Sequence, residues 1–292
     1  MEAELLLDAR ADLGEGPAWE AGSGLLHWVD IRAGELHTFD PSSREDRTHS
    51  LGEPIGCAAP SRDGDLLLAL RSGFWSLSRT PGSLTLLASP EKIPGNRFND
   101  GKCDPAGRFL AGTMDDAEKE ASGSLYSLSP GCEPKTLLTG LRISNGLTWS
   151  PDFGSFYFID TPTRLVTAFD YDLESGAISN PRPVIHVPEE MGWPDGMTSD
   201  LDGMLWIALW GGAKVTRWDP VTGQMSAAFP LPALNITSCI FGGPDLSDLF
   251  ITSARKGMTP AELARFPHSG GLFRLRTGVR GLPTFEFGSR ME

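Results

Sequence analysis

The stretch NGLTWSPDFGSFYFID, residues 145–160, contains the core of a pattern that recurs along the chain. It opens with a small residue, continues through an apolar run, turns at residues 151–154 and ends in a second apolar run. Aromatic and β-branched residues on both sides of a turn rich in Pro, Asp and Gly indicate strands rather than a helix. The stretch therefore predicts two neighbouring antiparallel strands.

The same opening appears in six places. Its copies lie at residues 15–19, 55–58, 99–103, 145–149, 195–198 and 237–240. The five glycines at 16, 56, 101, 146 and 196 are 40, 45, 45 and 50 residues apart. A period of about 40–50 residues with several short strands per unit is typical of a β-propeller blade. We therefore predict an all-β fold, a six-bladed β-propeller with four-stranded blades around a central channel, in one domain spanning residues 1–292.

Apolar runs mark the second and third strands of each blade. We expect them at 25–30 and 35–40, 66–70 and 73–77, 108–113 and 123–128, 155–160 and 165–169, 204–208 and 214–218, and 248–252 and 271–275. The run Glu4–Leu7 is expected to pair into the last blade and close the ring. Two long connections interrupt the pattern, an acidic one at 114–122 and another at 254–270. The second contains Thr259-Pro260-Ala261-Glu262, which predicts a short helix.

Net charge, the length of apolar segments and the spacing of cysteines exclude several classes of function. A net charge of −13 argues against nucleic acid and acidic membrane surfaces as partners. No segment approaches the roughly 18 apolar residues of a membrane helix, and the acidic start is unlike a signal peptide, so we expect a cytoplasmic protein. Cys57, Cys103 and Cys239 occupy similar places in three blades without metal-type spacing, which predicts buried core thiols. No pattern specifies an oligomer.

Three polar residues stand directly before the repeat glycines. Glu15, Asn145 and Asp195 each enter the inner strand of a different blade. Because the inner strands of a propeller run in one direction, these side chains are expected at one mouth of the channel. Two close carboxylates repel each other unless a proton or cation lies between them. The set predicts one divalent metal ion, for which oxygen ligands suit Ca²⁺, Mg²⁺ or Mn²⁺ best and tolerate Zn²⁺ or Fe²⁺. The alternative is that the three residues only cap turns.

The sequence gives less support to catalytic sites built on histidine or serine. Among the histidines, only His268, in the long connection of blade 6, is near enough to the mouth, and it is interpreted as a solvated loop residue, with a place at the mouth as the alternative. No serine has the GxSxG context of a nucleophile elbow, which argues against a serine hydrolase. Trp210 is interpreted as a structural residue, with stacking on the ring of a bound ligand as the alternative.

Several motifs together resemble the gluconolactonase and senescence-marker-protein (regucalcin) family of six-bladed propellers, especially its bacterial sugar-lactonase members. The motifs lie at 13–17, 97–102, 111–114, 123–126, 144–147, 194–196, 208–212, 241–245 and 252–257. The resemblance implies that Glu15, Asn145 and Asp195 bind the metal, in agreement with their repeat positions. It also implies that Arg97 and Asn99 contact the substrate. For Arg97, an ion pair with a neighbouring acid is the alternative.

The family also uses an acidic residue of the blade 3 connection to bind sugar hydroxyls. Here that position falls on Ala117, between Asp116 and Glu118. We assign the role to Asp116 and interpret Glu118, like Asp115 and Glu120, as part of a solvated acidic loop.

These inferences lead to a metal-dependent hydrolase that opens aldonolactones, either pentono- or hexonolactones, to aldonic acids. The expected partner is thus a small sugar lactone. Asp195 is assigned as both metal ligand and general base, with Asp100 as the alternative base. A propeller hydrolase for phosphotriesters or other lactones, and a noncatalytic calcium-binding propeller, are the rival functions.

Overall fold

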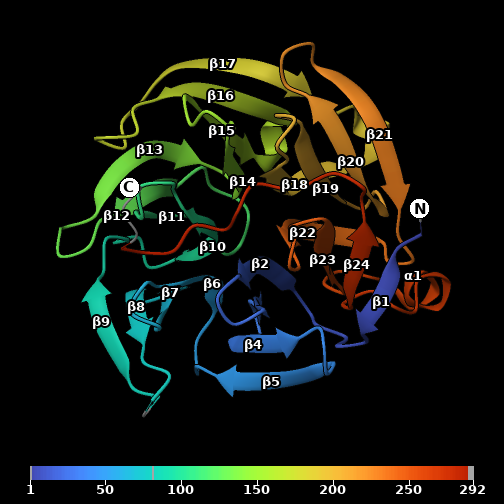
Figure 1. Cartoon of the computed structure of the whole chain (residues 1–292), viewed down its shortest axis with the longest axis horizontal. Helices are drawn as coiled ribbons and strands as arrows, with labels where there is room; N and C mark the ends of the chain where they lie inside the picture. Colours follow the sequence, from blue (N-terminus) through green and yellow to red (C-terminus); the bar gives the residue numbers. More distant parts are fainter. Residues whose placement is uncertain (1, 81, 289–292) are drawn as a thin grey trace.

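Six antiparallel sheets of four strands form a ring in the computed structural model, which describes residues 2–80 and 82–288 (Figure 1). The first three blades are β2 (Gly14–Glu20), β3 (Leu25–Asp30), β4 (Glu35–Asp40) and β5 (Glu45–Ser50); β6 (Ile55–Pro60), β7 (Leu66–Leu70), β8 (Gly73–Leu77) and β9 (Leu84–Ala88); and β10 (Asn96–Cys103), β11 (Phe109–Asp115), β12 (Gly123–Leu128) and β13 (Lys135–Leu141).

The other three blades complete the ring. They are β14 (Ser144–Trp149), β15 (Ser155–Asp160), β16 (Leu165–Tyr171) and β17 (Ile178–His186); β18 (Trp193–Ser199), β19 (Leu205–Trp210), β20 (Lys214–Asp219) and β21 (Gln224–Pro230); and β22 (Asn235–Gly242), β23 (Asp248–Ala254), β24 (Leu272–Arg276) and β1 (Glu4–Leu7). Short helices η1 (Thr161–Thr163), η2 (Glu189–Met191) and α1 (Pro260–Arg265) lie in the connections. The predicted all-β, six-bladed fold is confirmed.

The N-terminal strand closes the ring as predicted. Strand β1 pairs antiparallel with β24 and is the outermost strand of blade 6, with Leu5 opposite Phe273. Blade 6 therefore consists of one strand from the start of the chain and three from its end. Helix α1 also has the predicted start, a capping box in which Thr259 and Glu262 bond each other's backbone N–H groups.

Apolar side chains fill the space between neighbouring blades. One cluster joins Trp206 of blade 5 to Phe241 and Phe273 of blade 6, and Phe74 and Phe98 join blades 2 and 3 in another. Cys57, Cys103 and Cys239 are buried in these clusters, which confirms the prediction of core thiols. The second strand of blade 3 is longer than expected and continues through Asp115, so the connection to β12 begins at residue 116.

Each inner strand carries a β-bulge near its start. The pairing register shifts between Glu15 and Ala18, Ile55 and Cys57, Phe98 and Gly101, Asn145 and Leu147, Pro194 and Met197, and Ile236 and Ser238. A bulge bends its strand and re-aims the side chains around it. The repeated opening of the sequence is thus a repeated bulge, and the glycines let the bulged strands approach closely. A Cβ on Gly146 would lie 2.6 Å from the carbonyl oxygen of Asp195 in the next blade.

The C-terminal segment crosses the ring on the face opposite the inner-strand starts (Figure 1). Its backbone N–H groups donate to turns between first and second strands, from Leu282 to Ser199 O and from Phe287 to Pro60 O. This covering segment was not anticipated from the sequence. Within the described residues, no helix has the length and apolar character needed to cross a membrane.

Candidate metal centre and substrate cavity

A cavity of about 440 Å³ lies where the inner strands begin. This size suits a small organic ligand. Its wall is formed by Leu13, Glu15, Arg97, Asn99, Met114, Glu118, Arg142, Ile143, Asn145, Thr161, Pro162, Trp193, Asp195, Trp210, Lys256 and Gly257. The predicted metal ligands Glu15, Asn145 and Asp195 are therefore brought together, and the predicted substrate residues Arg97 and Asn99 lie in the same wall.

The three candidate ligands come from the bulges of β2, β14 and β18 and are almost completely buried, with exposed fractions of 3% for Glu15, 4% for Asn145 and 5% for Asp195. Glu15 accepts a hydrogen bond from the N–H of Gly16 at 2.8 Å through one carboxylate oxygen. Gly16 has a φ of +53°, a conformation that favours glycine. The glycine after Glu15 therefore shapes the backbone that holds this carboxylate.

The electrostatics of the site favour the protonated carboxyls when no cation is present. Burial and repulsion from Asp100 raise the pKa of Glu15. Burial and repulsion from Glu15 raise the pKa of Asp195 well above its usual range. These groups can be ionised together at neutral pH only if positive charge is supplied beside them.

A chain of hydrogen bonds orients Asn145. Arg97 Nη1 donates to Asn99 Oδ1 at 2.7 Å, and Asn99 Nδ2 donates to Asn145 Oδ1 at 3.0 Å. Asn145 Nδ2 in turn donates to Thr161 Oγ1 at 2.8 Å, and Thr161 donates to the carbonyl of Pro194 at 2.8 Å. Arg97 can only donate, so Asn99 must accept through its oxygen and donate through its nitrogen. The direction of each later hydrogen bond in the series follows from this.

These residues fit a divalent cation. Among the described residues, the buried Oδ1 of Asp195 has no hydrogen-bond partner. The bond from Asn99 occupies one lone pair of Asn145 Oδ1 and leaves the other available as a ligand. Glu15, Asn145 and Asp195 would hold the cation with three oxygen atoms, which suits hard ions, and two carboxylates would balance its charge.

The structure separates the two acidic candidates of the blade 3 connection. Asp116, the predicted hydroxyl-binding residue, accepts a hydrogen bond from Arg97 Nε at 2.9 Å and pairs with Arg71 at 3.3 Å. It is not one of the wall residues among those described. Glu118, interpreted from the sequence as a solvated acid, does line the cavity. Asp116 therefore contacts Arg97 and not the ligand space, whereas Glu118 is an acid of this loop in the cavity wall.

Several wall residues were missed by sequence reasoning. Thr161 follows the second strand of blade 4, so the same argument that placed the other connections at this mouth applies to it. Trp193 lies two residues before Asp195, and Arg164 stacks on its ring at 3.7 Å. Trp210 packs against an apolar core cluster, as expected of a structural residue, and also lines the cavity. His268 is not part of the described wall.

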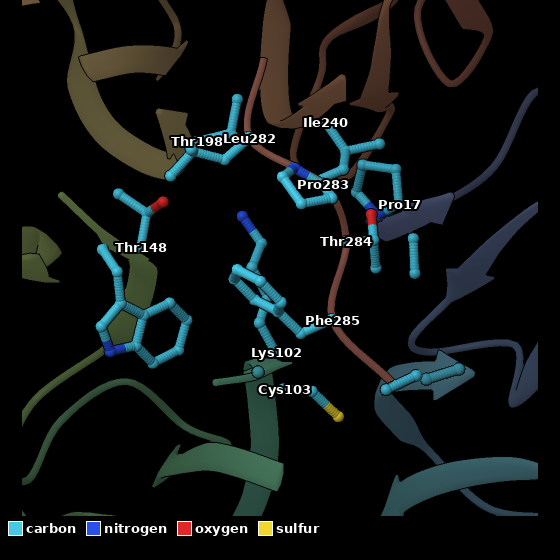
Figure 2. Close-up of a pocket in the computed structure, with 15 residues that line it drawn as sticks. Pro17, Lys102, Cys103, Thr148, Thr198, Ile240, Leu282, Pro283, Thr284 and Phe285 are labelled. Atoms are coloured by element: carbon cyan, nitrogen blue, oxygen red, sulfur yellow. The ribbon is translucent and has the colours of Figure 1, made fainter. Parts of the chain in front are cut away.

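A second cavity lies further along the inner strands, beside Leu282, Pro283, Thr284 and Phe285 of the C-terminal segment (Figure 2). Its volume is about 30 Å³, enough for one or two water molecules but not for a sugar. Lys102 extends into it and donates to the carbonyl oxygen of Met197. Burial lowers the pKa of Lys102, and attraction to Asp100 opposes this change. The ammonium of Lys102 also opposes the rise that burial causes in the pKa of Asp100.

The chain matches the model of the SMP-30/gluconolactonase/LRE-like region over residues 13–255. The protein belongs to this family.

Individual relatives resemble almost the whole chain. It is 40% identical over 281 residues to the Bacillus subtilis (strain 168) protein named "Putative sugar lactone lactonase YvrE", covering 95% of this chain and 96% of that protein. Regucalcin from Oryctolagus cuniculus is 38% identical over 294 residues, with 98% of each chain covered. The crystal structure of regucalcin from Agrobacterium tumefaciens, described as a calcium-binding protein, is 30% identical, with a TM-score of 0.93 over 98% of this chain and 97% of that one.

Proposed function

We propose that the protein is a metal-dependent lactonase that opens aldonolactones to aldonic acids, with pentono- and hexonolactones as the candidate substrates. The family relationship and the name of the Bacillus relative support this activity. One observation carries the proposal. Glu15, Asn145 and Asp195 converge beside Arg97 in a cavity of about 440 Å³, and Asp195 Oδ1 lacks a hydrogen-bond partner among the described residues.

The reaction adds water to the lactone carbonyl carbon and breaks the bond from that carbon to the ring oxygen. A divalent cation would polarise the carbonyl and lower the pKa of nearby water. Arg97 keeps a fixed orientation through its bonds to Asp116 and Asn99, so its remaining N–H groups are available for a substrate oxygen. Asn99 holds Asn145 in place by the bond described above.

Asp195 is the proposed general base. It would accept a proton from the attacking water and return it to the ring oxygen as the ring opens. Asp195 lines the cavity, whereas Asp100, the alternative base, is 1% exposed and not part of the described wall. Asp100 also accepts a bond from the N–H of Gly101 at 2.7 Å. This placement supports Asp195 as the base and gives Asp100 an electrostatic role.

The test is proton release from xylono-, arabinono-, galactono- and gluconolactone, followed with a pH indicator and corrected for spontaneous hydrolysis. Chelator-treated protein is compared with protein refilled with Ca²⁺, Mg²⁺, Mn²⁺, Zn²⁺ or Fe²⁺. We expect hydrolysis to return with metal and to be abolished in Glu15→Ala. No acceleration over buffer with any of these metals would refute the proposal.

A noncatalytic calcium-binding protein is the second candidate, favoured by the description of the Agrobacterium relative. Calcium affinity measured by calorimetry, together with the hydrolysis assay, distinguishes the two. Calcium binding that depends on Glu15 but brings no turnover of sugar lactones, other lactones or phosphotriesters would establish the noncatalytic function.

A further inference from the structure

One tryptophan at the mouth of the ring is exposed to an unusual degree. Trp193, the first residue of β18, is 41% exposed, although tryptophan residues are on average highly buried. It lines the large cavity, and within the described part of the chain it belongs to none of the apolar core clusters. Packing in the core therefore does not explain the position of this side chain.

Arg164 holds the indole in place from one side. Its guanidinium carbon lies 3.7 Å from the centre of the Trp193 ring, and its Nη1 donates to the carbonyl oxygen of Gly192 at 2.8 Å. Arg164 has a φ of +61°, and its carbonyl oxygen accepts a bond from the N–H of Val187 at 2.9 Å. A guanidinium over an aromatic face is a favourable contact. One face of the indole is thus covered, and the ring is held ready for a ligand on the surface that remains.

The backbone also determines where the indole lies. Gly192, directly before Trp193, has a φ of +106°, and a Cβ there would lie 2.6 Å from the carbonyl oxygen of Trp210. Trp193 and Trp210 are directly opposite each other on β18 and β19, so their side chains lie on the same face of the blade. Both line the cavity, as does Pro162 of η1. The wall therefore contains a preformed apolar surface.

Trp193 lies further out in the cavity than the candidate metal ligands. Asp195, two residues later, is only 5% exposed. A substrate whose carbonyl group lies at the metal ligands therefore has its far end in the outer part of the cavity, where Trp193 is. The cavity volume of about 440 Å³ is in the range that holds drug-sized ligands, which are larger than the lactone of a single sugar.

We propose that Trp193 forms a subsite for a second sugar ring, so that the preferred substrates are lactones of disaccharide aldonic acids. This inference rests on the proposed lactonase function. A sugar ring carries C–H groups on its faces and hydroxyls around its edge. The indole covers one C–H face, while the hydroxyls at the edge stay in contact with solvent. Water adds to the lactone carbonyl as before, and the bond between the two sugars stays intact.

The charges in the same wall favour a sugar ring over a long acyl or aryl group. Arg142 and Lys256 line the cavity and both retain contact with solvent. A large apolar group in the outer part of the cavity would remove these cations from water without replacing their hydrogen bonds, which is costly. A second sugar ring offers an apolar face to Trp193 and keeps a hydrated edge.

Substrates with one and with two sugar rings test this proposal. We would measure kcat and KM of the metal-loaded protein with gluconolactone and with cellobionolactone and maltobionolactone, which add a glucose to it in opposite anomeric orientations. Wild type should have a higher kcat/KM for at least one of the disaccharide lactones. For that substrate, Trp193→Ala should lower kcat/KM about tenfold, mainly through KM, and change it less than about twofold for gluconolactone. Trp193→Phe keeps an aromatic face and should retain most of the preference.

The matched control is Leu201→Ala. Leu201 belongs to the same blade and is 50% exposed, but it lies in the turn between β18 and β19, where its N–H donates to the carbonyl oxygen of Arg280 in the C-terminal segment. It is therefore on the face opposite the cavity, and its replacement should leave the kcat/KM values for all three lactones unchanged.

Equal relative losses with one-ring and two-ring lactones in Trp193→Ala would overturn the proposal, as would a wild type that opens gluconolactone more efficiently than both disaccharide lactones. Unchanged metal affinity and melting temperature would show that the variants keep the fold. If wild type opens none of the three lactones, the lactonase function fails. Calorimetric binding of gluconate, cellobionate and maltobionate to the metal-loaded protein then tests the subsite by itself. Tighter binding of a disaccharide acid that depends on Trp193 would support it, and equal affinities for the three acids would refute it.

Discussion

The buried carboxyl groups of Glu15 and Asp195 suit a bound cation, but they lower the stability of the folded protein when no cation is bound. Their pKa values are raised by burial and by neighbouring carboxylates. A carboxyl whose pKa is higher in the folded than in the unfolded state binds more protons when folded. The free energy of unfolding of the metal-free protein should therefore decrease as the pH rises above about 5.

Asp195→Asn removes one of these charges and keeps the shape of the side chain. We expect the variant without metal to be more stable than wild type at pH 8, by about 1–3 kcal/mol. The difference should shrink toward pH 5, where the wild-type carboxyls hold protons. Urea unfolding of chelator-treated protein at both pH values measures this effect. Equal stability at pH 8 would contradict the proposed repulsion, and the variant should also lose lactone hydrolysis.

Thr161 is a positioning residue for Asn145. Thr161→Val removes the acceptor of the bond from Asn145 Nδ2 and the donor to the Pro194 carbonyl. We expect metal affinity to fall about 10–100-fold, the usual effect of losing a group that orients a ligand. Thr161→Ser keeps the hydroxyl and should bind metal nearly as well as wild type. Calorimetric titration with metal compares the two, and similar losses in both variants would argue against positioning by the hydroxyl.

At the residue scale, sequence reasoning recovered residues at equivalent repeat positions and failed in the loops. Glu15, Asn145 and Asp195 were found because one repeat position maps to one place in a ring. Glu118 was expected in a solvated acidic loop, and its side chain is 40% exposed. Its additional place in the cavity wall was not predicted, because it depends on a left-handed φ and on the bond from the Glu118 N–H to the Asp115 carbonyl, which the spacing of acidic residues does not reveal.

Among the structural elements, the bulged inner strands determine how closely neighbouring blades approach. Gly146→Ala would place a Cβ 2.6 Å from the Asp195 carbonyl oxygen. We expect a loss of about 1–3 kcal/mol in unfolding free energy, together with weaker metal binding, because blades 4 and 5 must separate. Gly154→Ala, in the same blade, meets its nearest atom at 3.6 Å and is the control, with little expected change. Denaturant unfolding measures both, and equal stability of the two variants would contradict this role for Gly146.

The middle strands of each blade could be predicted from the sequence better than the outermost strand. The second and third strands were located from their apolar runs, and several, such as Leu25–Asp30 and Ser155–Asp160, have the expected bounds. The outer strands gave no such signal. In β5, Glu45–Ser50, most residues are exposed and polar, so the strand is defined by its pairing with β4 rather than by an alternation of apolar residues.

For the whole molecule, closure by β1 is the contact that connects the two ends of the chain. Leu5 packs against the core between blades 5 and 6. We expect Leu5→Asp to cost about 2–4 kcal/mol and to promote aggregation, because it weakens the pairing that covers the edge of β24. Leu86→Asp, at a 50% exposed position of the outer strand β9, should have little effect. Thermal unfolding with light scattering tests this, and equal behaviour of the two variants would show that closure by β1 does not govern stability.

The number of blades and the closing strand followed from the repeat, whereas the C-terminal segment did not. Its residues lie outside the repeat and bond to turns of several blades through backbone groups, such as Phe287 N–H to Pro60 O. Backbone bonds of this kind leave little trace in the identity of the side chains.

The shared sixth blade also has a consequence for biosynthesis. Residues 4–7 leave the ribosome near the start of translation, but their partner strand, residues 272–276, is made near the end. At about 5–20 residues per second, the first strand waits on the order of tens of seconds with an unpaired edge. During that interval the edge is open to association with other chains, and the ring closes only after synthesis is nearly complete.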